Sequence, residues 1–570
     1  MARDRWVHHL DYLITLVGYS VGAGTFQKFP YLCMRNGGGA FLILFMLFTI
    51  IGAIPCVFVE MVIGQFSQSG PVRVWNICPP FKGIGLGTVA ISWTYATYNS
   101  GIFAWYLYYF FNSFSTYLPW TQCSNDWNTA TCVTHDMHIN DININNTMST
   151  NITIGGMTAA EEYWRFKVLD ITEGLENLAG IRWPLVGCLA ITMVAVLLCL
   201  IWGIRISGKI VYVTVGVPYL LNTIFLIRGC MLPGSAEGIY YYIYPNFQML
   251  QDPKMWMEAC AYAFFSMGIG MGCIITLSGH NNFRNNCFRD SIAMCLMDAL
   301  TTIFVGFSVF GIIGHVAYIR GLDVKAFQSS GFNLAFIVYP EAVATLPCPQ
   351  LWSALTFLML MSLLIDTLIP SFEIVVTALA DQLPGLAKRR WLIVCSVLLS
   401  SSLVALLFMT RGGIYVLTLV DWYATFPSLA LFATMECIAV NFCYGTQQLQ
   451  QDIQTMWGKT APRCISFCMR FVCPVLLLVI FTFSLYTYRP PQYAEYVYPA
   501  WATVVGWMIS MASIVPFPII FVWTVYHTSG TTLIEKLEKA IRPNKKWGSR
   551  VPNECENQDV NFPSVLQENL

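Results

Sequence analysis

The chain has 570 residues, of which 56% are hydrophobic and only 11% are charged. Charged residues make up about a quarter of a soluble domain, so this composition argues against a soluble enzyme. Lysine plus arginine and aspartate plus glutamate balance at 31 each, so the net charge does not indicate a nucleic-acid partner. We therefore expect a chain embedded in a lipid bilayer, with most side chains facing lipid or other helices.

Apolar segments long enough to cross a bilayer follow one another along the chain. We expect about twelve transmembrane helices in one integral domain with no attached soluble domain. They lie near Tyr12–Met34, Gly39–Gln65, Ile84–Tyr117, Pro184–Ile201, Ile210–Gly229, Ala259–Leu277, Ala293–Ile319, Trp352–Leu379, Trp391–Met409, Ile414–Phe442, Phe467–Tyr486 and Ala500–Tyr526. The pattern predicts an all-α membrane protein.

Basic residues between the segments indicate their orientation. They fall on one side, which we expect to be cytoplasmic: Arg3, Arg5, Arg73, Lys82, Arg205, Lys209, Lys388, Arg389, Arg390, Lys536, Lys539, Lys545 and Lys546. The loop 119–181 then lies outside, and it carries acceptor sequons at Asn145 and Asn151. We expect a cytoplasmic N-terminus (1–11), a membrane domain (12–526) and a cytoplasmic tail (527–570), and we expect the protein to lie in the plasma membrane.

Most of the twenty cysteines lie inside apolar runs, where a cysteine behaves as a small buried hydrophobe. Cys123 and Cys132 differ, because they lie in the polar loop that carries the sequons. If that loop is extracellular, its environment favours a disulfide between them. No spacing of cysteines resembles a zinc site.

Two of the twelve segments carry clustered glycines. The first reads VGYSVGAGTFQKFPY and the sixth reads FFSMGIGMGC. Each glycine costs a helix about 1 kcal/mol relative to alanine, and unwound backbone at membrane depth is tolerated only where it is buried in protein or lines a cavity. Broken helices in corresponding positions of two halves indicate a midplane binding site. The alternative is close helix packing through small residues.

Three stretches carry a resemblance to a known family: FPYLCMRNGGGAF, GAIPCVFVEMVIGQF and PWTQCSNDWNTATC. From about Arg3 to Tyr526 the chain resembles the neurotransmitter:sodium symporter family. The resemblance implies the inverted-repeat fold of the bacterial leucine transporter, in which helices one to five are repeated by helices six to ten and helices one and six are unwound. It also implies alternating access and sodium coupling, usually with chloride, for amino acids, monoamines or osmolytes.

The resemblance implies a sodium site between helices one and eight. Its ligands would be Gly18, Val21, Leu363, Asp366 and Thr367. Sodium prefers hard oxygen ligands, and an intramembrane aspartate is a functional hypothesis by default. The alternative for Asp366 is a protonated aspartate with a structural hydrogen bond.

The resemblance also implies two gate pairs. Lys28 and Asp421 would form the extracellular pair, and Arg3 and Asp381 the cytoplasmic pair. Lys28 stands where many members have arginine, and a lysine lacks the bidentate fork of arginine, so this gate is expected to be looser. The alternative for Arg3 is a solvated surface charge.

The first sodium site and the chloride site depart from the family pattern. The degenerate sodium site would consist of Ser20, Thr25, Ser266 and Asp298, with Thr25 and Asp298 in place of amides. Phe45 and Tyr262 replace two chloride ligands, while Ser266 and Thr302 keep hydroxyls. The Asp298 carboxylate would repel an anion, so we do not expect chloride to bind. Sodium is the expected coupling ion.

The residues implied for the solute site are Gly22, Tyr95, Asn99, Phe265, Met271, Thr367 and Ser371. Gly22 stands where monoamine carriers have aspartate, which favours an amino or imino acid over a cationic amine. In helix three the family has a tyrosine that contacts the solute. Ungapped alignment places Asn99 there, and a shift of one residue places Tyr98 there, so both remain open.

The sequence thus predicts a sodium-coupled symporter of a small amino-acid-like or other zwitterionic solute, independent of chloride. Its partners would be that solute and the lipid bilayer, without nucleic acid. The alternative is a transport-inactive divergent member that senses a ligand or binds a partner protein. An enzyme is not expected, because the sequence has no nucleophile–base pair or metal-ligand spacing that we recognise.

Overall fold

The computed structural model describes residues 5–133, 157–321, 323–324, 331–425, 427–544 and 547–548. These residues form helices almost throughout, and the one sheet among them is an antiparallel pair of two-residue strands. In this pair, β1 (Gln492–Tyr493) and β2 (Tyr496–Val497) place Gln492 opposite Val497 and Tyr493 opposite Tyr496. The predicted all-α class is confirmed.

The helices follow the predicted apolar segments. Those before the second glycine cluster are α1 (His9–Ser20), α2 (Gly24–Arg35), α3 (Gly39–Phe48), η1 (Thr49–Ala53), α4 (Ile54–Ser67), η2 (Arg73–Ile77), η3 (Pro79–Phe81), α5 (Lys82–Asn112), α7 (Ala159–Glu162), η4 (Tyr163–Leu169), α8 (Trp183–Ile201), α9 (Ile204–Cys230), α10 (Ser235–Ile243), η5 (Phe247–Gln251) and α11 (Pro253–Ser266). Those after it are α12 (Cys273–Ser278), α13 (Cys287–Arg320), α14 (Gly331–Asn333), η7 (Leu334–Val338), α15 (Tyr339–Ala344), α16 (Pro349–Gln382), α17 (Pro384–Ala387), α18 (Arg390–Ala405), η8 (Leu406–Met409), α19 (Gly413–Thr425), α20 (Ser428–Ile438), η9 (Ala439–Gly445), α21 (Thr446–Trp457), α22 (Arg463–Phe467), η10 (Cys468–Val472), α23 (Cys473–Tyr486), α24 (Ala500–Ile514), α25 (Pro516–His527) and α26 (Leu533–Ile541).

Nine helical runs in the described part of the chain are long and apolar enough to cross a membrane. The other three predicted segments take different forms. Two of them are broken, into α1 and α2 and into α11 and α12, and the third is α5, a continuous helix of 31 residues that includes glycine, serine, threonine and tyrosine. Together these elements account for the twelve predicted segments.

The second break follows directly from its glycines. Gly268, Gly270 and Gly272 have φ angles of +66°, +79° and +77°, a region that side chains with a Cβ disfavour. The helix therefore stops at Ser266 and restarts at Cys273. The first break is shorter and leaves the segment 21–23 between α1 and α2.

Three wide π-helical turns each directly precede a helix with proline in its first turn. They are η1 before Pro55, η7 before Pro340 and η10 before Pro474. Proline has no backbone N–H and its ring crowds the carbonyl four residues earlier. A wider turn accommodates that loss without ending the helix.

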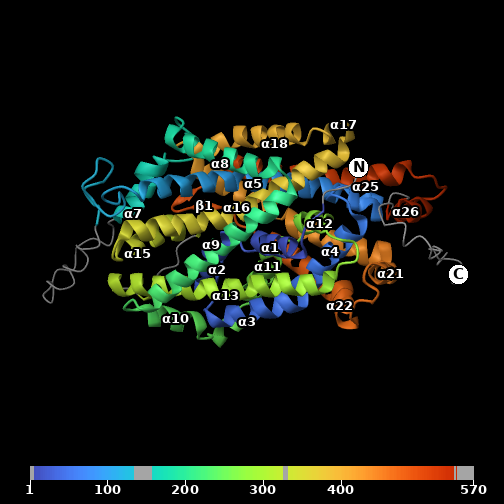
Figure 1. Cartoon of the computed structure of the whole chain (residues 1–570), viewed down its shortest axis with the longest axis horizontal. Helices are drawn as coiled ribbons and strands as arrows, with labels where there is room; N and C mark the ends of the chain where they lie inside the picture. The colour runs from blue at the N-terminus through green and yellow to red at the C-terminus, as the bar shows by residue number, and fades with distance from the viewer. Residues whose placement is uncertain are drawn as a thin grey trace.

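Helices α5 and α16 pack against each other in the interior of the molecule. In Figure 1, α7 and α15 lie at one end of the long axis, whereas α21 and α26 lie at the other end. Near the first end, Trp164 of η4 stacks on Phe336 of η7 with ring centroids 4.2 Å apart. The two broken helices, α5, α16 and α19 together surround the cavity described next.

Candidate solute and sodium site

A cavity of about 350 Å³ lies between the two helix breaks. Its walls come from α1, α2, α5, α11, α14, α16, α19 and α20 and from the turn that joins α11 to α12. The sequence-predicted residues that line it are Ser20, Gly22, Thr25, Lys28, Tyr95, Asn99, Phe265, Ser266, Met271, Thr367 and Asp421. Residues from both predicted breaks therefore meet at one cavity, as expected for unwound helices that bind a ligand.

The segment between α1 and α2 lies against α16 at Gly22. A methyl group placed on Gly22 would lie 2.9 Å from Oγ1 of Thr367, so a side chain at this position would displace that hydroxyl. Ser371, one turn further along α16, is buried and donates its hydroxyl to the Thr367 carbonyl at 2.7 Å. Ser371 is not among the cavity-lining residues, and its hydroxyl is hydrogen-bonded to the helix backbone instead.

Both candidates for the helix-three position line the cavity. The amide nitrogen of Asn99 donates to the Tyr95 carbonyl at 2.8 Å, and the Tyr98 ring meets the Tyr95 ring edge-on at 5.3 Å. Successive residues of a helix point about 100° apart, so two neighbours can reach the same cavity. Tyr98 and Asn99 are therefore both available to a solute.

Several lining residues were not predicted from the sequence. They include Tyr19, Gln27, Leu32, Ile102, Glu258, Phe332, Leu364, Thr425 and Leu429. Tyr19 connects the two breaks, because its hydroxyl donates to Sδ of Met271 at 3.3 Å. Glu258 is held by Asn36, whose amide nitrogen lies 2.7 Å from Oε2, and by an ion pair with Arg35.

The Asp298 carboxylate lies buried on α13 without a hydrogen-bond donor. The hydroxyls of Ser20 and Ser266 lie beside it, yet both Asp298 oxygens and Ser266 Oγ are buried without a hydrogen-bond partner. The Ser20 hydroxyl donates instead to the Val17 carbonyl at 3.1 Å, which leaves its lone pairs free. A buried carboxylate without a partner is costly. This group of oxygens fits a bound cation.

Phe45 and Tyr262, which replace two chloride ligands of the family, lie together in an aromatic cluster. Phe45 and Tyr262 are 5.5 Å apart between ring centroids, and Phe29 packs against both of them at 5.4 Å and 5.3 Å. Thr302 keeps a hydroxyl, which is buried without a hydrogen-bond partner. The cluster of Phe29, Phe45 and Tyr262 thus packs apolar ring faces where the family has anion ligands.

The residues of the other predicted sodium site lie where α1 meets α16. A methyl group placed on Gly18 would lie 3.4 Å from Cβ and Cγ of Asp366. Oδ1 of Asp366 accepts a hydrogen bond from the Thr214 hydroxyl of α9. The Thr367 hydroxyl points back to the Leu363 carbonyl at 3.4 Å, and Val21 is buried. Gly18 and Asp366 are adjacent, while Thr367 also faces Gly22.

The structure describes both residues of the predicted extracellular gate pair but only one residue of the cytoplasmic pair. Nζ of Lys28 lies 3.4 Å from Oδ1 of Asp421. Arg3 lies outside the described residues, so its pairing with Asp381 stays a prediction. Asp381 accepts a hydrogen bond from the Gly70 backbone at 2.9 Å and lies 3.7 Å from Nη1 of Arg73. At the same end, the Trp6 indole donates to the Leu277 carbonyl at 3.1 Å and ties the start of the chain to α12.

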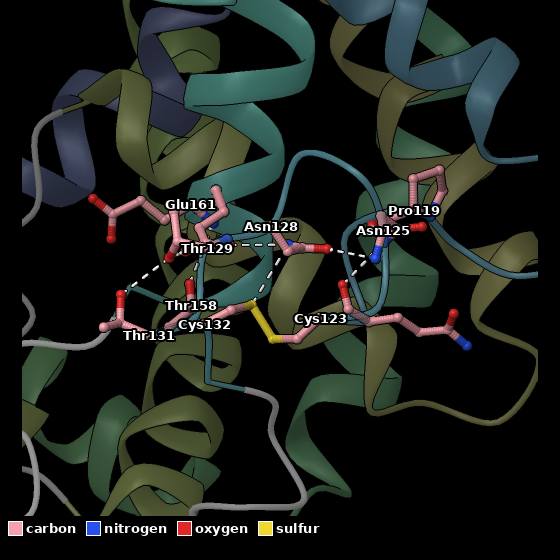
Figure 2. Close-up of a disulfide and its surroundings, with 11 residues drawn as sticks. Pro119, Cys123, Asn125, Asn128, Thr129, Thr131, Cys132, Thr158 and Glu161 are labelled. Atoms are coloured by element: carbon pink, nitrogen blue, oxygen red, sulfur yellow. Dashed lines mark hydrogen bonds between the residues drawn. A yellow bond between two sulfur atoms is a disulfide. The ribbon is translucent and has the colours of Figure 1, made fainter.

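The predicted disulfide between Cys123 and Cys132 is present (Figure 2). Asn128, inside the loop that it closes, donates from its amide nitrogen to Glu162 Oε2 at 3.0 Å. The Thr129 backbone N–H donates to the same oxygen at 3.0 Å, and the Thr129 hydroxyl donates to Oε1. Glu162 thus holds the disulfide loop against α7. Asn145 and Asn151 lie outside the described residues.

No group of three or more histidine, cysteine, aspartate or glutamate side chains that could hold a metal ion occurs in the described ranges. Asp298 instead has the hydroxyls of Ser20 and Ser266 beside it, and Asp366 has the hydroxyl of Thr214. Such hard oxygen ligands suit alkali and alkaline-earth cations rather than zinc or copper.

Comparison with known proteins gives consistent matches. Residues 3–528 match the model of the sodium:neurotransmitter symporter family. The chain is 36% identical to a sodium- and chloride-dependent glycine transporter 1 of Xenopus laevis, covering 96% of this chain and 88% of that protein. It is also 36% identical to a sodium- and chloride-dependent glycine transporter 2 of Xenopus laevis, covering 96% of this chain and 72% of that protein. It is likewise 36% identical to a sodium- and chloride-dependent GABA transporter 2 of Rattus norvegicus, covering 100% of this chain and 94% of that protein.

Proposed function

Because the chain belongs to the sodium:neurotransmitter symporter family, we propose that it carries a small amino-acid-like or other zwitterionic solute together with sodium, by alternating access. The family consists of transporters, so the expectation that the chain is not an enzyme is confirmed. The cavity between the two helix breaks is the proposed solute site.

The observation that carries the sodium proposal is the unpartnered carboxylate of Asp298. Its two oxygens and Ser266 Oγ are buried without a hydrogen-bond partner, and Ser266 lines the cavity together with Ser20 and Thr25. A sodium ion bound by Ser20, Thr25, Ser266 and Asp298 would supply the missing positive charge. A carboxylate binds a cation more strongly in a low dielectric than an amide does.

We propose a second sodium position at Gly18, Val21, Leu363, Asp366 and Thr367. The proximity of Gly18 to Asp366 supports it. The Thr214 hydroxyl that donates to Asp366 would compete with sodium for one carboxylate oxygen, while the other oxygen remains available. An ion here would connect α1 to α16, and hence the first repeat to the second.

The zwitterionic nature of the solute rests on the cavity lining. Gly22 supplies no carboxylate for an isolated amine, while Tyr95, Tyr98 and Asn99 supply polar groups on the facing helix. The relatives named as glycine and GABA transporters act on zwitterionic amino acids, which agrees with this choice. Gly22, Tyr95, Asn99, Phe265, Met271 and Thr367 are the proposed contacts, with Tyr98 and Tyr19 beside them.

We further propose that transport is independent of chloride, although the relatives are named sodium- and chloride-dependent. The aromatic cluster of Phe29, Phe45 and Tyr262, and the fixed carboxylate of Asp298, support this difference. The chain is also proposed to lie in the plasma membrane with both termini in the cytoplasm and the disulfide loop outside. The separation of α7 from α21 and α26 in Figure 1 agrees with that orientation.

Uptake into proteoliposomes tests the function. Purified protein is reconstituted, and accumulation of radiolabelled glycine, GABA, proline and other amino acids is measured with an inward sodium gradient or with choline in its place. We expect concentrative uptake of at least one zwitterion that needs sodium. Equal uptake in sodium and choline would contradict the proposal. Sodium-dependent solute binding without uptake would instead favour the transport-inactive alternative.

A further inference from the structure

A second cavity, of about 260 Å³, lies on the other side of α5 from the solute cavity. It is bounded by α5, the end of α18 with η8, α19 and α24. Protein interiors contain few voids larger than a water molecule, so a cavity of this size is a candidate binding site. Its lining residues include no ionisable side chain.

The polar groups of this cavity have their hydrogen bonds supplied within the protein. The Thr94 hydroxyl donates to the Ala90 carbonyl at 3.0 Å, and the Ser513 hydroxyl donates to the Ser510 carbonyl at 2.7 Å. The Thr97 hydroxyl bonds both the Trp93 carbonyl at 2.7 Å and Ser401 Oγ at 2.9 Å. A buried water needs two to four polar partners, so neither water nor a polar solute is favoured here.

The helices that enclose the cavity present apolar side chains outward. Leu403 of α18 is 61% exposed, and Val504 and Met508 of α24 are 59% and 65% exposed. In a chain of this family these surfaces face hydrocarbon, so the medium next to the cavity is lipid rather than water. An empty apolar cavity forfeits dispersion contacts that a hydrocarbon chain restores. We propose that the acyl chain of a membrane lipid occupies this cavity.

The acyl chain would contact α5 and α19, two of the helices that also line the solute cavity. Along α5, Trp93, Thr94 and Thr97 face the second cavity, while Tyr95, Tyr98 and Asn99 face the solute cavity. Along α19, Val420 and Ala424 face the second cavity, while Asp421 and Thr425 face the solute cavity. One layer of helices therefore separates the proposed lipid from the solute, and the lipid would support the wall on which the solute rests.

Photolabelling tests this site without relying on transport. The full chain is placed in nanodiscs that contain a phospholipid with a diazirine in its acyl chain, irradiated, digested and analysed by mass spectrometry. We expect adducts on the peptides that contain residues 90–97 and 404–424. Ala90→Phe, and independently Ala512→Phe on α24, should fill the cavity and lower those adducts several-fold.

The matched control is Val504→Phe, which adds the same ring to a lipid-facing position outside the cavity lining. It should leave the adducts on residues 90–97 unchanged. The proposal is overturned if these peptides stay unlabelled while the outer surface of α24 is labelled. It is equally overturned if the two cavity-filling variants, shown by gel filtration to be folded, are labelled like the wild type.

Discussion

Nζ of Lys28 lies 3.4 Å from Oδ1 of Asp421, and this ion pair joins α2 to α19 at the edge of the solute cavity. The Lys28 side chain is 58% exposed, so water screens the attraction and the pair is worth only about 0.2–1 kcal/mol. Such a weak contact suits a gate that must open in every transport cycle.

Lys28→Arg should strengthen this gate, because a guanidinium can bind both carboxylate oxygens. We expect solute to dissociate toward the outside about two- to fivefold more slowly, in keeping with a gain of up to about 1 kcal/mol for an exposed pair. The measurement is the release rate of bound radiolabelled solute on dilution. Lys539→Arg is the control, since Lys539 pairs with Glu535 of its own helix and neither residue lines the solute cavity. A faster release in Lys28→Arg than in the wild type would contradict the gate assignment.

Asp366→Asn should remove most of the sodium-dependent increase in thermal stability. Two unit charges about 4 Å apart at an effective dielectric near 20 attract by about 4 kcal/mol, so the sodium concentration for half-maximal stabilisation should rise at least about tenfold. Asp452→Asn is the control, because Asp452 is buried on α21 and accepts a hydrogen bond from Tyr444. An unchanged sodium titration in Asp366→Asn would remove this residue from the site.

Peptide mapping under non-reducing conditions should recover Cys123 joined to Cys132 in protein purified from eukaryotic cells, and glycans on Asn145 and Asn151. The disulfide closes a short loop with a sequence separation of 9, for which loop-closure entropy predicts about 2.5 kcal/mol of stabilisation. Free thiols at both cysteines, or unmodified sequons in that protein, would contradict an extracellular loop.

Glu162 should stabilise the same loop. Its buried carboxylate accepts hydrogen bonds from Asn128 and from two groups of Thr129. Glu162→Gln replaces an acceptor oxygen with a donor, so we expect a loss of about 1–3 kcal/mol, seen as faster amide exchange at Thr129. Glu161→Gln, which breaks only a half-exposed ion pair with Arg165, should leave that exchange rate nearly unchanged. Equal effects of the two variants would contradict this role.

The parts of the fold that sequence predicted are those set by local chemistry. The break at Gly268, Gly270 and Gly272 follows from a backbone conformation that these residues adopt without strain. The twelve apolar segments follow from the thickness of the bilayer. The disulfide follows from two cysteines placed in the same polar loop.

The composition of the cavity depended on tertiary packing and was predicted only in part. Tyr19 has no motif of its own, and it reaches Met271 across 252 positions of sequence. Ser371 was expected at the solute site from the family resemblance, but it does not line the cavity, and its hydroxyl donates to the Thr367 carbonyl. The choice between Asn99 and Tyr98 assumed that only one residue could reach the solute, whereas both line the cavity.

The dependence on chloride turns on Asp298. In chloride-coupled members of the family a bound anion offsets the charge of the first sodium. Here the Asp298 carboxylate is fixed beside Ser20 and Ser266, and at about 4 Å it would attract sodium by about 4 kcal/mol at an effective dielectric near 20. A fixed charge of that strength can replace a mobile anion.

Replacing chloride with gluconate should therefore leave sodium-driven uptake unchanged in the wild type. The double variant Asp298→Asn with Phe45→Tyr should shift uptake toward chloride dependence, because it removes the fixed charge and restores a hydroxyl next to Tyr262. Phe45→Tyr alone is the control and should stay independent of chloride, since the carboxylate remains. If Asp298 is instead protonated, with no sodium beside it, Asp298→Asn alone should not weaken sodium activation. Strong chloride dependence in the wild type would show that the carboxylate does not replace the anion.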